Sequence, residues 1–172
     1  KTVDDARILL RSGAEKVCLN TAAIHNPDVV YQISQTFGAQ SVMVSIDVKK
    51  NFWGKYEVYT NCGTKNTHKS PVEIAELMVK KGVGELVINS IDRDGTLKGY
   101  DHELIKNITS AVPVPVIALG GASSIQDMKF GVTEDKCAGV AAGSFFVFHG
   151  KHRAVLINYP SKSELDIIRD SK

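Results

Sequence analysis

The sequence contains few cysteines and no long hydrophobic run, and both scarcities exclude classes of protein. Only three of the 172 residues are cysteine, at Cys18, Cys62 and Cys137. Because they are odd in number and far apart, they indicate neither a disulfide framework nor a paired metal site, and we expect a reducing, cytoplasmic setting. No stretch reaches the roughly 18 apolar residues of a membrane span. The first ten residues do not have the pattern of a signal peptide.

An excess of charge of one sign is also lacking. Lys and Arg together number 21 and Asp and Glu number 19, which gives a net charge of +2. This balance gives no reason to expect a nucleic acid or a membrane as a partner. The five histidines show no metal-ligand spacing, and no G-x-G-x-x-G motif follows a predicted strand. We therefore expect no metal and no cofactor.

What the sequence does contain is an alternation of predicted strands and helices. Short apolar runs predict strands at residues 16–20, 41–46, 85–89, 115–119 and 138–142. Apolar residues at helical spacing, with glycine or proline near the ends, predict helices at 2–12, 26–38, 71–81, 101–111, 124–131 and 163–169. Residues 51–67 interrupt the pattern with a predicted hairpin excursion. Alternating strands and helices of this kind indicate an α/β fold with a parallel sheet.

Polar residues or glycines follow every predicted strand. The sequence places Asn20 and Thr21, Asp47, residues 92–96, Gly120 with Gly121, and Gly143 with Ser144 at these positions. An open doubly wound sheet and a barrel both fit the alternation. Functional groups at the carboxyl end of every strand are typical of a barrel, which we therefore prefer.

The glycine pairs predict a phosphate site. Gly120 and Gly121 end one strand, and Gly143 and Ser144 end the next. Glycines let backbone N–H groups approach an anion, and barrels often bind phosphate after their last two strands. The alternative is a pair of tight turns with no ligand.

Carboxylates supply the candidate acid/base groups. Asp47 follows an apolar strand, where a partly desolvated carboxylate can transfer protons. A salt bridge to Lys49 or a helix cap is the alternative. Asp92 and Asp94 would lie on the same side of an extended loop, one acting on a substrate while the other orients Arg93. A solvated turn closed by a glycine is the alternative for this loop.

Several runs together resemble the cyclase subunit of imidazole glycerol phosphate synthase. They are KVCLNTAA at 16–23, SIDVK at 45–49, SIDRDGT at 90–96 with GYD at 99–101, and IALGG at 117–121, in the same order along essentially the whole chain. The resemblance implies a (β/α)8 TIM barrel and a lyase of histidine biosynthesis that uses no cofactor. It also implies a glutaminase partner subunit that supplies ammonia, and a bis-phosphorylated ribulosyl aminoimidazole carboxamide as substrate.

The resemblance assigns roles to individual residues. It implies that Asp47 is a catalytic acid/base group. Substrate and phosphate contacts fall to Asp94, Gly95 and Thr96, to Gly120, Gly121, Gly143 and Ser144, and to Asn20 and Thr21 as part of a second phosphate site. Lys16 and Glu85, which position alone indicates to be a structural ion pair, become two members of a charged gate through which ammonia enters.

Two departures from the family pattern leave other functions open. Leu119 stands where the histidine-pathway enzymes carry serine, and residues 141–160 look like those of a paralogous branch. The alternative function is therefore an ammonia-delivery subunit for amidine formation on a surface-polysaccharide sugar. A sibling phosphoribosyl isomerase ranks below both.

The length is short for a barrel. At about 31 residues per βα unit, residues 1–172 form a single incomplete barrel domain with a hairpin insertion around 51–67. We expect strands 4 to 8, with the N-terminal part missing, and no activity of this fragment alone. Two unpaired strand edges should make it aggregate or pair with another chain. A mass near 18.7 kDa with monodisperse, active behaviour would contradict this expectation.

Overall fold

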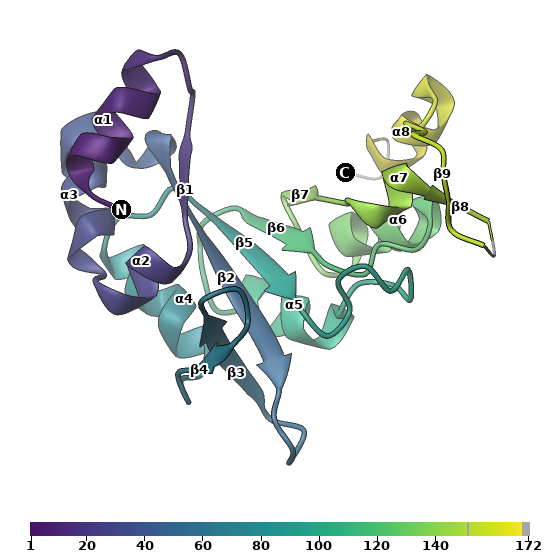
Figure 1. Cartoon of the computed structure of the whole chain (residues 1–172), viewed down its shortest axis with the longest axis horizontal. Coiled ribbons are helices and arrows are strands. Elements are labelled where there is room, and N and C mark those ends of the chain that lie inside the picture. The colour runs from purple at the N-terminus through teal and green to yellow at the C-terminus, as the bar shows by residue number, and fades with distance from the viewer. Residues whose placement is uncertain (151, 170–172) are drawn as a thin grey trace.

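The computed structural model describes residues 1–150 and 152–169, and a parallel sheet lies at its centre. Its strands are β1 (Val17–Leu19), β2 (Val42–Lys50), β5 (Glu85–Ser90), β6 (Val116–Leu119) and β7 (Gly139–Val140). All four pairings between successive members of this set are parallel. Within the described residues β1 pairs only with β2 and β7 pairs only with β6, so the sheet does not close (Figure 1).

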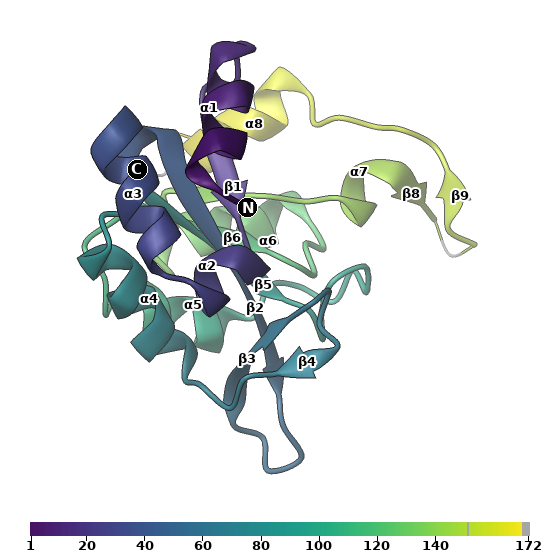
Figure 2. The ribbon, with the colours of Figure 1, turned by 60° about the vertical axis from the view of Figure 1, so that its left-hand side comes forward.

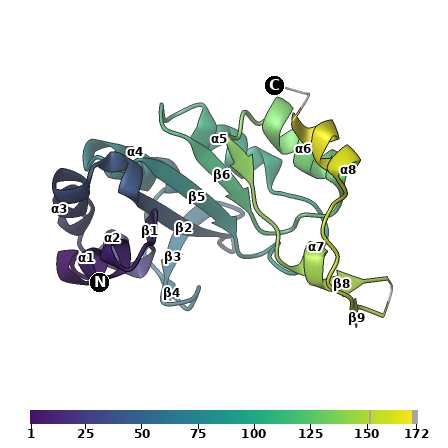
Figure 3. The same ribbon diagram turned by 90° about the horizontal axis from the view of Figure 1, so that it is seen from above.

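Helices connect the strands and cover one face of the sheet. They are α1 (Val3–Arg11), α2 (Thr21–His25), α3 (Asp28–Phe37), α4 (Pro71–Lys80), α5 (His102–Thr109) and α6 (Ile125–Thr133). A 3₁₀ turn, η1 (Ala39–Ser41), leads into β2. Figure 3, seen from above, shows α4 and α5 on one side of β2, β5 and β6. Among the residues that the structure describes, no helix covers the middle of the opposite, concave face (Figure 3).

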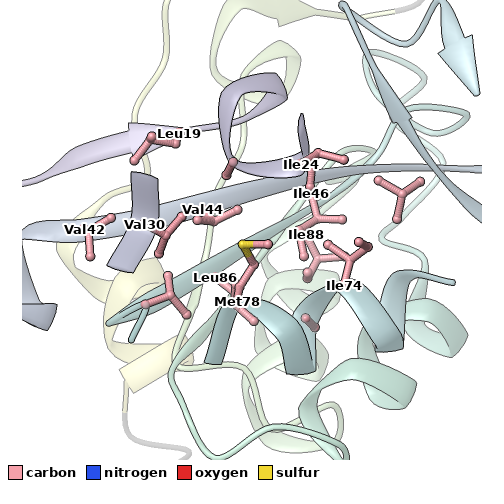
Figure 4. Packing of buried hydrophobic residues seen from close by; sticks show 14 of the residues in the cluster. Leu19, Ile24, Val30, Val42, Val44, Ile46, Ile74, Met78, Leu86 and Ile88 are labelled. Carbon is pink, nitrogen blue, oxygen red and sulfur yellow. The ribbon is translucent and has the colours of Figure 1, made fainter. Parts of the chain in front are cut away.

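The main core lies between the sheet and these helices. Val42, Val44 and Ile46 of β2 are completely buried, whereas the residues between them are partly exposed. This alternation is that of a strand with one face against helices. Met78 of α4 packs with Leu86 of β5 in the same cluster (Figure 4).

The elements that follow β7 lie outside the parallel sheet. After β7 come α7 (Ser144–Val147), a small hairpin of β8 (Phe148–His149) and β9 (Ala154–Val155), and α8 (Lys162–Arg169). Helix α8 contacts α6, and Figure 1 shows it at the opposite end of the molecule from α1. A second, smaller core around Tyr100 and Met128 joins α5, α6 and β6.

A second hairpin grows from the carboxyl end of β2. Strand β3 (Tyr56–Thr60) pairs antiparallel with β2, and β4 (Lys65–Asn66) pairs antiparallel with β3. The tip at 51–55 projects away from the helices (Figure 2) and exposes Phe52 and Trp53 almost fully. No helix in 1–150 and 152–169 has the length and apolar character needed to cross a membrane.

The predicted order of elements is confirmed, with four omissions. Every predicted strand and helix is present, with bounds that differ by a few residues at most. Short α2, the turn η1, short α7 and the β8–β9 hairpin were not predicted, because segments of two to five residues carry too little periodicity. One of the five histidines, His149, is an exposed residue of β8.

Candidate functional site

The concave face of the sheet presents its side chains in rows. Because directly paired residues of neighbouring strands point to the same face, the strand pairing defines each row. The row nearest the carboxyl end contains Tyr59, Asp47, Asn89 and Leu119, from β3, β2, β5 and β6. A middle row contains Ser45, Val87, Ile117 and Gly139, and a row near the amino end contains Cys18, Met43 and Glu85.

Asp47 occupies the centre of the carboxyl-end row. Its Oδ1 accepts a hydrogen bond of 3.1 Å from Nδ2 of Asn89. The alternative of a salt bridge to Lys49 is wrong, because Lys49 Nζ lies 3.9 Å from Asp92 Oδ1. Asp47 is therefore a partly buried carboxylate held by one neutral hydrogen-bond donor.

The β5–α5 loop is curled rather than extended. The backbone N–H groups of Arg93 and Asp94 both donate to the Ser90 carbonyl, and that of Thr96 donates to Arg93 O. The expectation that Asp92 and Asp94 share one side of an extended loop is therefore wrong. Asp92 Oδ2 instead accepts from the backbone N–H of Lys50 at 2.9 Å.

Asp101, for which no site role was predicted, organises the end of this loop. It is buried, and its carboxylate accepts hydrogen bonds from Tyr56 Oη, Ser90 Oγ and the backbone N–H of Leu104. Arg93 Nε lies 3.6 Å from Asp101 Oδ2, so neither Asp92 nor Asp94 orients the guanidinium. The GYD run at 99–101 was the available signal, since an acidic residue before an amphipathic run marks a helix N-cap.

The predicted phosphate residues come together in one hollow. Its walls come from the loop after β5, the glycines after β6 and the start of α7: Asp94, Gly95, Leu97, Gly120, Gly121, Ala122, Ala142, Gly143, Ser144 and Phe145. Thr96 stands beside them, and its hydroxyl donates to Arg93 O. The hollow brings together all the residues predicted to contact substrate or phosphate at this end of the sheet except Thr96.

Glycine is required at two positions of this hollow. Gly120 and Gly121 have φ values of +92° and +99°. A Cβ on Gly120 would lie 2.6 Å from Ser90 O, and one on Gly121 would lie 2.3 Å from Gly99 O. The loop after β5 therefore packs directly on the glycines, and the Gly99 N–H donates to Gly121 O at 2.8 Å. No larger residue fits this contact.

Asn20 and Thr21 lie apart from this hollow, at the end of β1. Asn20 Nδ2 donates to Ser45 O, and Thr21 Oγ1 donates to Asn20 Oδ1 and accepts from the Asn61 N–H. They line a separate hollow together with Cys18 and His25. The two predicted phosphate regions therefore flank the sheet, with Asp47 between them in the strand order.

Lys16 and Glu85 form the ion pair that their positions suggested. Lys16 Nζ lies 2.8 Å from Glu85 Oε2, at the amino end of the concave face. Glu85 begins β5 and Asn89 lies four residues further on the same face. At about 3.3 Å per residue, this places the ion pair roughly 13 Å from the Asp47 row.

The cysteines and the potential metal ligands do not form a further site among the described residues. Burial raises the pKa of the Cys137 thiol to about 12, and desolvation is also the main cause of the raised pKa of Cys18. All three cysteines are free. In the part of the chain that the structure describes, no three His, Cys, Asp or Glu side chains gather in a way that could hold a metal ion.

Comparison with known proteins gives a consistent family. A family model described as "Histidine biosynthesis protein" matches residues 1–153. A Pseudomonas aeruginosa protein named "Putative imidazole glycerol phosphate synthase subunit hisF2" is 50% identical over 168 residues, which are 97% of this chain and 66% of that protein. A Vibrio vulnificus protein named "Putative imidazole glycerol phosphate synthase subunit hisF3" is 43% identical over 165 residues, 95% of this chain and 64% of that protein.

A third relative has a name that does not begin with "Putative". The imidazole glycerol phosphate synthase subunit HisF of Alkaliphilus metalliredigens is 40% identical over 149 residues, 87% of this chain and 59% of that protein. The chain thus spans less than two thirds of the length of these three curated relatives.

Proposed function

Because the chain belongs to the histidine biosynthesis protein family, we propose that it acts, within the complete protein, as the cyclase subunit of imidazole glycerol phosphate synthase. The observation that carries this proposal is the position of Asp47. It lies at the carboxyl end of the sheet, on the same face and edge as the glycine-lined hollow. A carboxylate beside an anion site is the arrangement that acid/base chemistry on a phosphorylated substrate requires.

The substrate is a ribulosyl aminoimidazole carboxamide with a phosphate at each end. One phosphate binds in the hollow of Gly121, Gly143 and Ser144, where backbone N–H groups and a hydroxyl supply donors. The other binds near Asn20 and Thr21, across the strand order from the first. Anchoring both ends holds the reacting centre over Asp47, and such orientation supplies much of a rate acceleration.

Asp47 moves protons in this reaction. Ammonia condenses with the ribulosyl carbonyl, the imidazole ring closes, and an aminoimidazole carboxamide ribotide leaves. Each step needs a proton taken from nitrogen or delivered to oxygen, which a carboxylate within hydrogen-bonding reach can do. The raised pKa of Cys18 keeps the thiol of the adjacent strand protonated, so it does not compete as a base.

Ammonia enters from the opposite end of the concave face, supplied by a glutaminase subunit. The ion pair of Lys16 and Glu85 marks this entrance, with the side-chain amine half exposed. Between it and Asp47 lies the middle row, of which Val87 and Ile117 are apolar. A small neutral molecule can pass along such a surface without being held by it.

The test is the substitution Asp47→Asn in the complete protein, assayed with added ammonia so that no glutaminase is needed. We expect correct folding and a loss of turnover of roughly 10²- to 10⁴-fold, the usual contribution of a positioned acid/base group. Asp92→Asn is the matched control, because Asp92 bonds the Lys50 backbone outside the row. Turnover of the Asp47 variant within a few-fold of wild type would defeat the proposal.

A second candidate function is ammonia delivery for amidine formation on a surface-polysaccharide sugar. Leu119 favours it, because this apolar side chain occupies the Asp47 row where the histidine-pathway enzymes carry serine. The names hisF2 and hisF3 of two relatives also fit a paralogous branch. A direct assay of imidazole glycerol phosphate formation separates the two functions, since full activity would rule out this second one.

A further inference from the structure

We infer that Asn89 is a positioning residue for Asp47. Its side-chain amide can form a hydrogen bond with the Asp47 carboxyl group in both the ionised and the protonated form. The inference rests on the proposed acid/base role of Asp47 and goes one step beyond it. The motivating observation is an incomplete set of hydrogen bonds. Asn89 Nδ2 donates to Asp47 Oδ1 at 3.1 Å, whereas Asn89 Oδ1 is buried and has no hydrogen-bond partner within the described chain.

A buried acceptor without a partner is uncommon and needs a reason. A carboxamide presents two donors on one side and an acceptor on the other, and rotation of the amide by a half turn exchanges them. An ionised carboxylate only accepts, so it must face the NH₂ group. A protonated carboxyl donates, so it can face the carbonyl oxygen. The same side chain therefore serves Asp47 before and after a proton transfer.

The surroundings of Asn89 direct it to Asp47 alone. Its neighbour on the other side of the row is Leu119, which offers no hydrogen bond. Its Oδ1 lies 3.0 Å from the position of an ideal Cβ on Gly120, and Ser90 O lies 2.6 Å from the same position. A half-turned amide would thus carry its NH₂ group toward a region that holds a carbonyl oxygen. The lack of a side chain at Gly120 leaves room for this amide.

Few other ionisable groups act on this pair. Tyr59 faces Asp47 from β3, and Cys18 lies one strand away on β1. Lys49, two residues after Asp47 on β2, pairs with Asp92. Strand β6 contributes only Leu119 to this row. Among the residues that the structure describes, Asn89 is therefore the hydrogen-bond partner of the Asp47 carboxylate.

The test is the pH dependence of kcat/KM, measured in the complete protein with added ammonia. Asn89→Leu keeps the size of the side chain but removes the donor. We expect kcat to fall roughly 10- to 100-fold, as for loss of a hydrogen bond to a charged group. We also expect the acidic limb of the profile to move to higher pH, because the ionised form loses its donor. KM should change much less than kcat.

Asn89→Asp is the second variant. It is nearly identical in shape, and it places a second carboxylate beside Asp47, so the acidic limb should move further than in Asn89→Leu. Asn107→Asp makes the same chemical change on the exposed side of α5 and should leave the profile unchanged. A purely structural role of Asn89 would lower the amount of folded enzyme without moving the limb.

A measurement on the wild-type protein covers the case in which both variants unfold. The side-chain amide resonance of Asn89 should titrate with the same midpoint as the acidic limb. An unmoved limb in folded variants, or an amide resonance that does not titrate, would overturn the inference. If Asp47→Asn is inactive and the Asn89 variants are normal, only this inference fails. If Asp47→Asn is active, the proposed function itself fails.

Discussion

Asp101 shows how much one buried residue can organise. Its carboxylate joins the hairpin through Tyr56, β5 through Ser90, the β5–α5 loop through Arg93 and the first turn of α5 through Leu104. Burial strengthens each of these interactions, and it also makes an unpaired partner costly. The loop that lines the candidate phosphate hollow is thus held in place from its far end.

Asp101→Ala should therefore destabilise the protein by about 3 kcal/mol, because it leaves two hydroxyls, the Leu104 N–H group and the partly exposed Arg93 guanidinium without this partner. The measurement is equilibrium unfolding by urea. Asp28→Ala is the matched control: Asp28 pairs with Lys81 at 2.7 Å, but on the surface. We expect the control to lose less than about 1 kcal/mol. Equal losses in the two variants would show that Asp101 does not organise the loop.

The cysteines should differ in reactivity. Cys137 is buried, and desolvation together with the nearby Asp135 charge raises its pKa to about 12. At pH 8 its thiol is therefore almost wholly protonated and shielded, whereas Cys62 is exposed. Iodoacetamide labelling followed by peptide mass spectrometry should modify Cys62 in minutes and Cys137 only after denaturation. Equal labelling of the two in the folded protein would contradict the buried position of Cys137.

At the scale of elements, the β3–β4 hairpin depends on one carboxylate. Glu57 on β3 is buried against β4, where Asn66 Nδ2 donates to its Oε2 at 2.5 Å. This hydrogen bond lowers the pKa of Glu57 below its ordinary value of 4.5. A lowered pKa means that the ionised form is the one the folded hairpin stabilises. The stabilisation of the folded hairpin by ionised Glu57 is therefore fully present above pH 4.5. It is lost as the pH falls through the lower pKa that Glu57 has in the folded state.

We therefore expect the hairpin to open before the rest of the sheet on acidification. As the pH falls below 4.5, the hydrogen-exchange protection factors at 56–60 and 65–66, corrected for the intrinsic exchange rate at each pH, should decrease while those at 85–90 stay high. Glu57→Gln removes the titrating group, so the protection factors of its hairpin should not change with pH over this range. Simultaneous loss of protection in the hairpin and in β5 would refute a local role for Glu57.

Most elements could be predicted because their signals are local. Alternating burial along β2, the proline at the start of α4 and the glycine after α3 all leave marks in neighbouring residues. The curl of the β5–α5 loop could not be predicted in the same way, because it depends on hydrogen bonds to Ser90 and on the Asp101 contacts.

The residues of the candidate site likewise differ in whether the sequence around them carries a signal. Asp47 and the glycines could be found from their positions after apolar strands, as could Lys16 and Glu85 before them. Asn89 could not be found in this way, because its importance comes from lying opposite Asp47. The sequence of one strand does not determine its register with the neighbouring strand. A polar residue two places after Val87, on the same face of a predicted strand, was the available signal.

For the whole molecule, the open sheet is the dominant feature. Within the described residues, strands β1 and β7 each lack a neighbouring strand on one side, and the concave face leaves Val87, Ile117 and Leu119 only partly covered. Free strand edges and uncovered apolar side chains promote association. The 172-residue chain should therefore self-associate, whereas a longer protein that also contains the remaining third of its relatives' length should not.

Light scattering coupled to size-exclusion chromatography measures this directly. We expect the mass of the 172-residue chain to increase with concentration, and that of the longer protein to stay constant. A monodisperse 18.7 kDa species at all concentrations would contradict the expectation. Because apolar association is weakened by mild denaturant, low urea should shift the short chain toward the monomer before it unfolds.

The two-residue period of β2 has a consequence for how sequences of this kind can change in length. Asp47 reaches the concave face only because it lies four positions after Met43 and two positions after Ser45 on the same strand. A single inserted or deleted residue in this strand would exchange its two faces, turning the carboxylate toward the helices and Val48 toward the substrate side. The hairpin tip at 51–55 carries no such constraint. Length variation among related chains should therefore collect in the turns and be absent from β2.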